Sequence, residues 1–261
     1  MQARLGNQAL ILKDRGDWDG AMALHKEEEQ ICRDMGNANA LAMSLGNQAV
    51  ILHLRGDLDG AMVLHKEVER AWRQTGDLDR LQGSLGNQAS ILEARGDLDG
   101  AMALHKEEER ICRLLGNIDS LQISLGNQAI IQRVRGDLDG AIALLKEKER
   151  ICRQLGNKDG LQGSLHGQAI ILRARGDLDG AMALHKEGER ISRDLGNVYA
   201  LGASLDNQAL ILLDRGDLDG AMGLLKEAEG IDRRLGNIDG LQANLGNQAA
   251  ILQARGDLDG A

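Results

Sequence analysis

Histidine and cysteine recur along this chain at a spacing that could suggest a zinc site. The histidines occupy one repeat position and the cysteines lie seven residues after it: His25, His65, His105 and His185, then Cys32, Cys112 and Cys152. Seven helical residues span roughly 10 Å, whereas each ligand of one zinc ion lies about 2 Å from the metal. The histidine and cysteine of one repeat therefore cannot share an ion. We expect no metal and no cofactor, and we expect these side chains to pack at a helix interface.

The tripeptide Arg-Gly-Asp begins at Arg15 and recurs every 40 residues up to Arg255. Such a tripeptide can act as an integrin-recognition loop, and the Asp-Leu-Asp-Gly sequence at 57–60 faintly resembles a calcium loop. A calcium loop needs about a dozen residues of irregular backbone. Glycine and aspartate are also the residues that end one helix and cap the next. We therefore predict a structural turn at each tripeptide.

Sets of catalytic residues are not found in the sequence. There is no Ser-His-Asp set, no P-loop and no GxGxxG motif after a strand. We therefore predict that the protein is not an enzyme.

All of these residues belong to a 40-residue repeat without insertion or deletion. The first segment of the repeat spaces apolar residues at i, i+4 and i+7, as at Leu45, Ala49 and Leu52, with Ile51 alongside. The second segment, for example residues 61–72, shows the same apolar spacing. Each repeat is therefore predicted to form two helices, A and B.

Short turns separate the predicted helices. Gly56-Asp57 lies between A and B, and a Gly-Asp or Gly-Asn pair lies between B and the next A. Such short connections make consecutive helices antiparallel and produce stacked hairpins. The sequence therefore predicts an all-α solenoid that forms a single domain over residues 1–261. It contains six repeats and a seventh helix A, as expected for a piece of a longer array.

The pattern LxNxAxxLxxxGDLDxAxxLH, followed by xxxIxxxLGN, resembles the tetratricopeptide repeat of the longer type. Similar units occur in kinesin light chain and in the spindle-orientation adaptors that bind GoLoco peptides. The resemblance covers the whole chain and is carried by Leu45, Ala49 and Leu52 before the turn and by Leu58 and Ala61 after it. It implies a right-handed superhelix whose concave surface, lined by helix A, takes extended peptides or partner helices.

Two departures from the family pattern imply looser packing between helices A and B. The family usually has Leu on helix A where this chain has Gln8, Gln48 and their equivalents. It has a small residue on helix B where this chain has Glu28, Val68, Glu108, Lys148, Gly188 and Ala228.

Asparagine and glutamine form two columns on helix A. In one interpretation the stacked amides satisfy each other or loop carbonyls between repeats. In the other, which the family resemblance implies, asparagines such as Asn87, Asn127 and Asn207 hold the backbone of a ligand.

Three columns of helix A, headed by Leu10, Lys13 and Asp14, vary from repeat to repeat while the others stay nearly constant. Their spacings of three and four place them on one helix face. Drift at exposed sites is one explanation and ligand recognition is the other. The candidate binding residues in these columns form an apolar strip with two guanidinium groups: Ile130, Arg133, Val134, Ile170 and Arg173.

Charge and composition restrict the partners. The formal charge is −9, and no apolar run approaches the roughly 20 residues of a membrane span, so we expect neither a nucleic-acid partner nor a membrane. The N-terminus does not resemble a signal peptide, which favours the cytoplasm. The cationic strip favours a protein or peptide ligand with acidic and aliphatic side chains.

Two functions follow from this sequence. The first is a protein-interaction scaffold, such as the sensor or adaptor part of a larger protein. The second is a structural array whose copies associate head to tail, because the face with Leu245, Ala249 and Leu252 matches faces that pack inside the other repeats.

Overall fold

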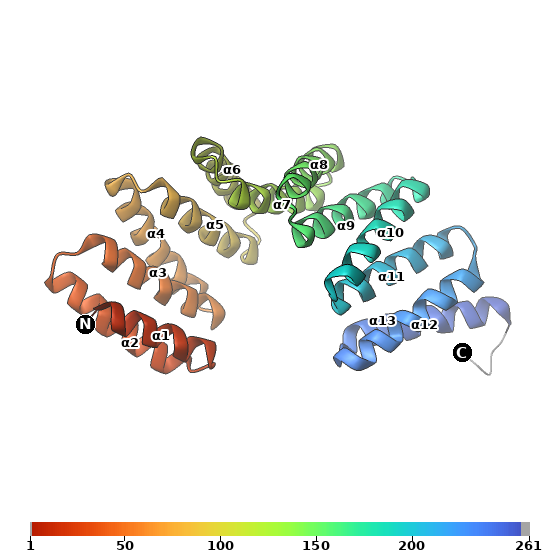
Figure 1. The fold of residues 1–261 in the computed structure, drawn as a ribbon, viewed down its shortest axis with the longest axis horizontal. Coiled ribbons are helices and arrows are strands. Elements are labelled where there is room, and N and C mark those ends of the chain that lie inside the picture. The colour runs from red at the N-terminus through yellow and green to blue at the C-terminus, as the bar shows by residue number, and fades with distance from the viewer. Residues whose placement is uncertain (1, 257–261) are drawn as a thin grey trace. The chain divides into compact units, whose positions relative to one another are not determined.

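The computed structural model describes residues 2–256; the last residues of the seventh repeat segment, 257–261, lie outside this range. The described residues form thirteen helices and no strand, which confirms the all-α prediction (Figure 1). The helices are α1 (Gln2–Asp14), α2 (Trp18–Asp34), α3 (Ala38–Leu54), α4 (Leu58–Thr75), α5 (Leu78–Ala94), α6 (Leu98–Leu115), α7 (Ile118–Val134), α8 (Leu138–Leu155), α9 (Lys158–Ala174), α10 (Leu178–Leu195), α11 (Val198–Asp214), α12 (Leu218–Leu235) and α13 (Ile238–Arg255).

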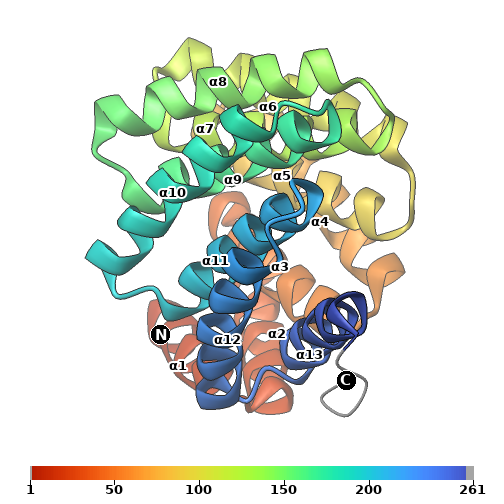
Figure 2. The ribbon, with the colours of Figure 1, turned by 90° about the vertical axis from the view of Figure 1, so that its right-hand side faces the viewer.

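The chain divides into two compact units, Met1–Ile131 and Gln132–Ala261. In each unit the odd-numbered helices are the predicted A helices and the even-numbered helices are the B helices. Consecutive helices run antiparallel, and α9 to α13 of the second unit lie beside their chain neighbours in both views (Figures 1 and 2). Each unit is thus a stack of helical hairpins.

The turns form as their residue types predict. Gly56 has a φ of +81°, in the left-handed region that glycine adopts without a Cβ clash. The Asp57 carboxylate caps α4 by accepting a hydrogen bond from the Gly60 N–H at 2.9 Å, a contact that contributes about 1 kcal/mol. The Gly-Asp pair therefore ends one helix and starts the next.

The arginine of the tripeptide joins neighbouring repeats. Arg55 donates to the Asp19 carboxylate of the preceding repeat at 2.6 Å. The same pairing recurs at Arg95–Asp59, Arg175–Asp139, Arg215–Asp179 and Arg255–Asp219. All three residues of the tripeptide are therefore engaged in the repeat architecture, which confirms the structural interpretation.

The glutamine column makes a second set of contacts between repeats. Gln48 on α3 donates to Glu29 on α2 at 2.8 Å, and Arg33 bridges Glu29 to Glu67 on α4. Further Gln–Glu pairs are Gln88–Glu69, Gln128–Glu109, Gln168–Glu149, Gln208–Glu189 and Gln248–Glu229. Gln48 and Gln128 also donate to the backbone carbonyls of His25 and His105 in the preceding repeat, at 3.4 and 3.5 Å. These glutamine amides thus bond the preceding repeat and not each other, because a carboxylate on the preceding helix B is a stronger acceptor within reach.

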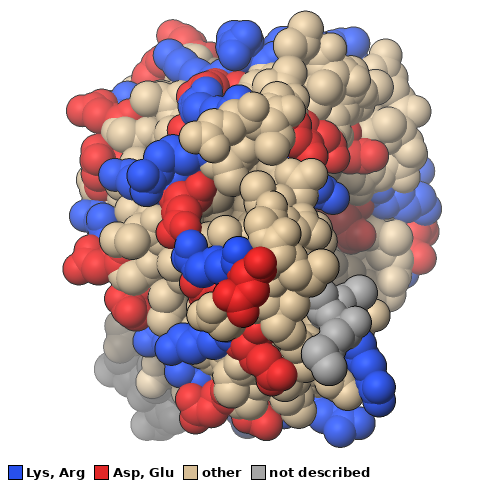
Figure 3. Space-filling model, turned by 90° about the vertical axis from the view of Figure 1, so that its left-hand side faces the viewer, with Lys and Arg blue, Asp and Glu red and all other residues tan. Residues whose placement is uncertain are grey.

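Charged side chains of both signs are interspersed on the surface. On the face seen in Figure 3, Lys and Arg alternate with Asp and Glu, and neither sign covers the face alone. This arrangement matches the ion pairs between repeats.

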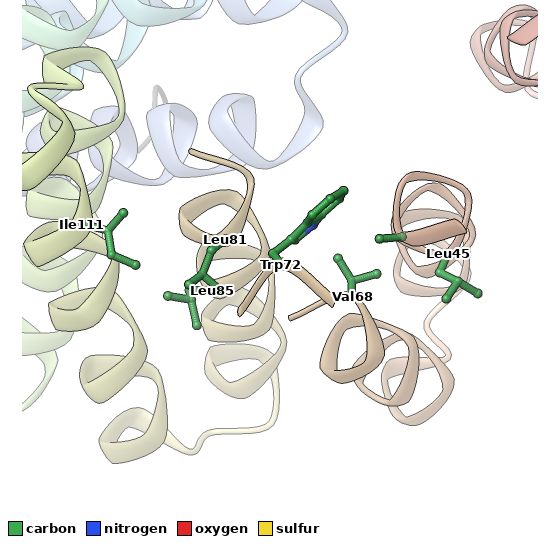
Figure 4. Packing of buried hydrophobic residues seen from close by; sticks show 7 residues of the cluster. Leu45, Val68, Trp72, Leu81, Leu85 and Ile111 are labelled. Carbon is green, nitrogen blue, oxygen red and sulfur yellow. The ribbon is translucent and has the colours of Figure 1, made fainter. Parts of the chain in front are cut away.

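The core of the first unit is aliphatic with one indole. Figure 4 shows Trp72 of α4 with Val68 and Leu45 on one side and Leu81 and Leu85 of α5 on the other. These side chains are buried. Burial of this kind supplies most of the free energy that holds the hairpins together.

One detail of the predicted core is wrong. Ile51, expected beside the buried face, is fully buried, whereas Leu52 and Leu64 are half-buried and pack at its edge. On helix B, His65 is buried in place of Leu64. An A helix lies between two B helices, so its buried face is wider than an i, i+4, i+7 stripe.

Candidate functional site

Within each unit, the odd-numbered helices present the variable columns on one side, which we call the A face of that unit. On α7, Ile130 and Val134 are 51% and 60% exposed, Arg133 is exposed and Asn127 is half-buried. Asn127 and Ile130 belong to the first unit with Asn87, and the other predicted residues belong to the second unit.

A cavity of about 430 Å³ opens on the A face of the second unit. Its lining consists of Ile170, Arg173, Ala174, Asn207 and Asp214, and we call it the α9–α11 cavity. Three of the predicted binding residues, Ile170, Arg173 and Asn207, therefore lie together. The size falls within the roughly 300–1,000 Å³ of ligand pockets.

The cation in this cavity already has a partner. Arg173 donates from Nε to Asp214 Oδ2 at 2.6 Å and from Nη2 to Asp214 Oδ1 at 3.2 Å. This partner was not predicted from the sequence; the next A helix supplies it as an aspartate in the neighbouring column. A ligand carboxylate would have to compete with Asp214 or share the guanidinium with it.

Asn207 is held by its own helix. Its Nδ2 donates to the Ala203 carbonyl at 2.7 Å, which fixes the orientation of the amide. Asn87 is exposed on α5 and lines a different cavity.

Two histidines lie next to each other in the second unit, and each is near an arginine. The rings of His166 and His185 meet edge to face with centroids 5.5 Å apart. Burial and then the Arg133 guanidinium lower the pKa of His166. Burial, His166 and Arg173 lower the pKa of His185 to about 4. Both imidazoles are therefore neutral at pH 7, and the charge of this region comes from the arginines.

A further cavity, about 310 Å³ in volume, lies on the A face of the first unit, between α3 and α5 and above α4. We call it the α3–α5 cavity. Its lining is Ala42, Met43, Gly46, Asn47, Val50, His65, Val68, Trp72, Asp79, Arg80, Gly83, Ser84 and Asn87. Of the predicted site residues it contains Asn87. Sequence reasoning missed Trp72 and Arg80, although both are unique at their repeat positions.

His105 and Cys112, both buried in the first unit, have hydrogen-bond partners close by. His105 lies between Glu108 and Glu93, with each ring nitrogen 2.8 Å from a carboxylate. Burial alone would lower the pKa of His105, but these two contacts raise it. The Cys112 thiol donates to Gln82 at 2.6 Å, and burial and Glu108 raise its pKa to about 11. Such a thiol is protonated and unreactive at neutral pH.

Neither a metal cluster nor a membrane helix is found in the described part of the chain. No group of three or more His, Cys, Asp or Glu side chains within 2–256 is arranged to hold an ion. No helix in that range is long and apolar enough to cross a bilayer.

Comparison with protein-family models and with curated proteins finds no match for this chain. Solved structures do match. The signal transduction ATPase with a tetratricopeptide repeat sensor from Pyrococcus horikoshii superimposes with a TM-score of 0.85 at 16% identity, over 97% of this chain and 39% of that one.

Two further structures share the fold. The putative kinesin light chain of Podosopora anserina, with nearly identical TPR-like repeats, has a TM-score of 0.63 at 18% identity, over 75% of this chain and 96% of that one. A Rap protein complexed with Competence and Sporulation Factor has a TM-score of 0.64 at 12% identity, over 97% of this chain and 75% of that one. The structural neighbours are thus tetratricopeptide-like repeat proteins, and the fold is a helical repeat solenoid.

Proposed function

We propose that this protein is a non-enzymatic interaction scaffold whose A face binds a peptide or helix of a partner protein. The observation that carries the proposal is the α9–α11 cavity, where an aliphatic side chain, an arginine and an asparagine converge: Ile170, Arg173 and Asn207. The Rap protein with the same fold was solved in complex with Competence and Sporulation Factor, which supports a binding role for such a surface.

The ligand that fits this face has acidic and aliphatic side chains. Arg133 is exposed and Arg173 is about one third exposed, so both can meet a carboxylate, and Ile170 offers an apolar contact. Asn127, Ile130 and Val134 on α7 are further candidate contacts for a partner. We expect this binding in the cytoplasm, because Cys32, Cys112 and Cys152 are buried free thiols.

The test begins with capture of partners from a native lysate and measurement of each affinity. Arg133→Glu with Arg173→Glu should abolish binding of the partner while helicity is retained, since neither side chain is in the core. The matched control reverses two exposed arginines on B helices, Arg150→Glu with Arg190→Glu. Equal affinities for the wild type and the A-face double variant would contradict the proposal.

The second candidate is head-to-tail self-association. Leu245 on α13 is 42% exposed, whereas the equivalent Leu85, Leu125, Leu165 and Leu205 are fully buried. An apolar face of another copy would bury it. Sedimentation velocity over a wide concentration range tests this candidate, and a monomer at every concentration would reject it.

A further inference from the structure

Four residues form an unusual combination in one part of the first unit, and three of them, Val68, Trp72 and Arg80, occur in no other repeat at their positions. Val68 and Trp72 on α4 stand where repeats one and three have glutamate and cysteine. Arg80 and Gly83 on α5 stand where repeat four has Ser120 and Ile123, and repeat five also has a glycine, Gly163, at the position of Gly83. The structure brings all four to the α3–α5 cavity. Changes that are scattered over 16 residues of sequence therefore meet at one place.

These substitutions explain why the cavity is open. In repeats one and three a glutamate fills the space beside a glycine, since a Cβ at Gly6 or Gly86 would meet Glu28 or Glu108 at 2.9 Å. At Gly46 the nearest atom is a Val68 methyl at 4.0 Å. On the opposite wall, a Cβ at Gly83 would meet nothing within 4 Å.

The lining has an apolar floor and one cation. Val68 and Trp72 are buried beneath the half-buried Val50 and the exposed Met43. The Arg80 guanidinium lies over the Trp72 ring, 5.1 Å from its centroid, and about 44% of its side chain is exposed. Stacking on the indole holds the guanidinium at the cavity edge while its outer N–H groups stay accessible.

The lining holds one cation, Arg80, and one carboxylate, Asp79. Asp79 accepts hydrogen bonds from Gln82 at 3.3 Å and from Asn117 at 3.5 Å. Arg80 donates from Nη1 to the Asp77 carboxylate at 3.4 Å, and its other N–H groups can meet an acidic ligand. Burial and then His53 lower the pKa of His65 to about 4, so its imidazole is neutral.

One buried atom in the lining has an unmet hydrogen-bonding capacity. His65 is 2% exposed, and its Nδ1 has no partner in the structure. An unsatisfied buried polar atom costs stability, about as much as a lost hydrogen bond. Only a polar atom, such as a backbone group of a bound segment, can satisfy it.

We propose that the α3–α5 cavity is a second, separate binding site, which takes a large apolar side chain of a partner segment whose neighbouring residue is Asp or Glu. The apolar side chain enters between Val50, Val68 and Trp72, and the carboxylate pairs with Arg80. Asn47 and Asn87, on opposite walls, contact the segment's backbone. The site does not depend on the α9–α11 cavity, which lies in the other unit.

The test uses Trp72 as its own reporter. Trp18 is the one other tryptophan, and Leu occupies its position in the following repeats, so Trp18→Leu leaves a single indole in the protein. Random linear peptides are panned against this variant, and N-acetylated, C-terminally amidated copies of the enriched sequences are titrated against it. We expect enriched peptides to pair Leu, Ile, Met or Phe with an adjacent Asp or Glu, and their binding to change Trp72 emission.

Variants built from the protein's own repeats separate binding from folding. Val68→Glu with Gly83→Ile refills the cavity with residues found at these positions in repeats one, three and four, and it should abolish binding without loss of helicity. Arg80→Ala should weaken binding about tenfold or more, whereas Arg110→Ala, an exposed arginine on α6, should not.

Several outcomes would overturn this second site. They are the absence of enriched peptides, enriched peptides without the apolar–acidic pair, and full affinity in the refilled variant. Loss of binding in the Arg133→Glu, Arg173→Glu variant would assign the peptides to the α9–α11 cavity instead. Full affinity in the Arg133→Glu, Arg173→Glu variant, together with loss of binding in the Val68→Glu, Gly83→Ile variant, supports the second site whether or not the α9–α11 proposal stands.

Discussion

Arg173 on α9 and Asp214 on α11 form a two-bond ion pair across the α9–α11 cavity, at 2.6 and 3.2 Å. The pair joins two consecutive A helices on the A face. Because a planar guanidinium matches both oxygens of a carboxylate, the geometry is specific. The internal carboxylate occupies the position that an acidic ligand would take.

Removal of this internal competitor should therefore strengthen binding of an acidic partner. We expect Asp214→Asn to raise the affinity several-fold and to make it more sensitive to salt, since the Arg173 charge is no longer neutralised. Titration calorimetry at two salt concentrations measures both effects. Asp179→Asn, which releases Arg215 elsewhere, is the control, and an equal gain there would argue against a local effect.

The buried histidines should make stability depend on pH in two directions. The raised pKa of His105 means that the folded protein keeps a proton that the unfolded chain releases above its value of 6.5. Its stabilising contribution is complete below pH 6.5 and is lost as the pH rises through the folded pKa. His65 and His185, whose pKa values fall to about 4, destabilise the fold as the pH drops from 6.5 toward 4.

Melting temperatures across this pH range check the assignment. His105→Gln should remove the alkaline loss of stability and lower the melting temperature near neutral pH, because Glu93 and Glu108 then lack their cation. The control is His53→Gln, at a half-buried histidine of α3; it should leave the loss of stability at alkaline pH unchanged. An unchanged alkaline limb in His105→Gln would show that His105 is not the group responsible.

Asp206 should be a destabilising residue at neutral pH. Burial and the nearby Asp232 raise its pKa from 3.8 to about 6, against the opposing hydrogen bond of Asn244. The folded state therefore favours the protonated form, and stability is lost as the pH rises through about 6. Gly46 and Gly86 occupy the same repeat position as Asp206. The substitution Asp206→Gly should therefore stabilise the protein at pH 8.

The free energy of unfolding at pH 8 should rise by about 1 kcal/mol, after allowance for the partial exposure of this carboxyl. Denaturant unfolding at pH 8 and at pH 3.5 measures it, because Asp206 is neutral at the lower pH and the gain should vanish there. A gain of the same size at both pH values would mean that helix packing, not charge, is responsible.

The core should respond to truncation in proportion to burial. Leu85→Ala removes a fully buried side chain and should cost about 2–5 kcal/mol. Leu92→Ala should cost less, because Leu92 is half-buried. Leu54→Ala, at a side chain that is 60% exposed, should stay within about 0.5 kcal/mol. Urea unfolding gives all three values, and equal losses would refute the assigned core.

The sequence by itself determined the helices, their ends and their stacking. The 40-residue period, the apolar spacing and the Gly-Asp turns are short-range signals, and Gly56 and Asp57 act through atoms within a few residues of them. Such local chemistry can be read without knowledge of the rest of the chain. The sequence also indicated Ile170 and Arg173, because their columns vary while the packed columns do not, and Asn207 through the asparagine column that the family resemblance singles out.

The tertiary structure alone decided which side chains meet. Gln48 finds Glu29 nineteen residues earlier, Arg173 finds Asp214 forty-one residues later, and Val68 and Gly83 open one cavity from two helices. These distances depend on the rotation and offset between stacked hairpins, which shape-complementary packing sets and local periodicity does not encode. A polar or cationic residue can thus be recognised in the sequence, but whether it is free for a ligand depends on the neighbour that packing places beside it.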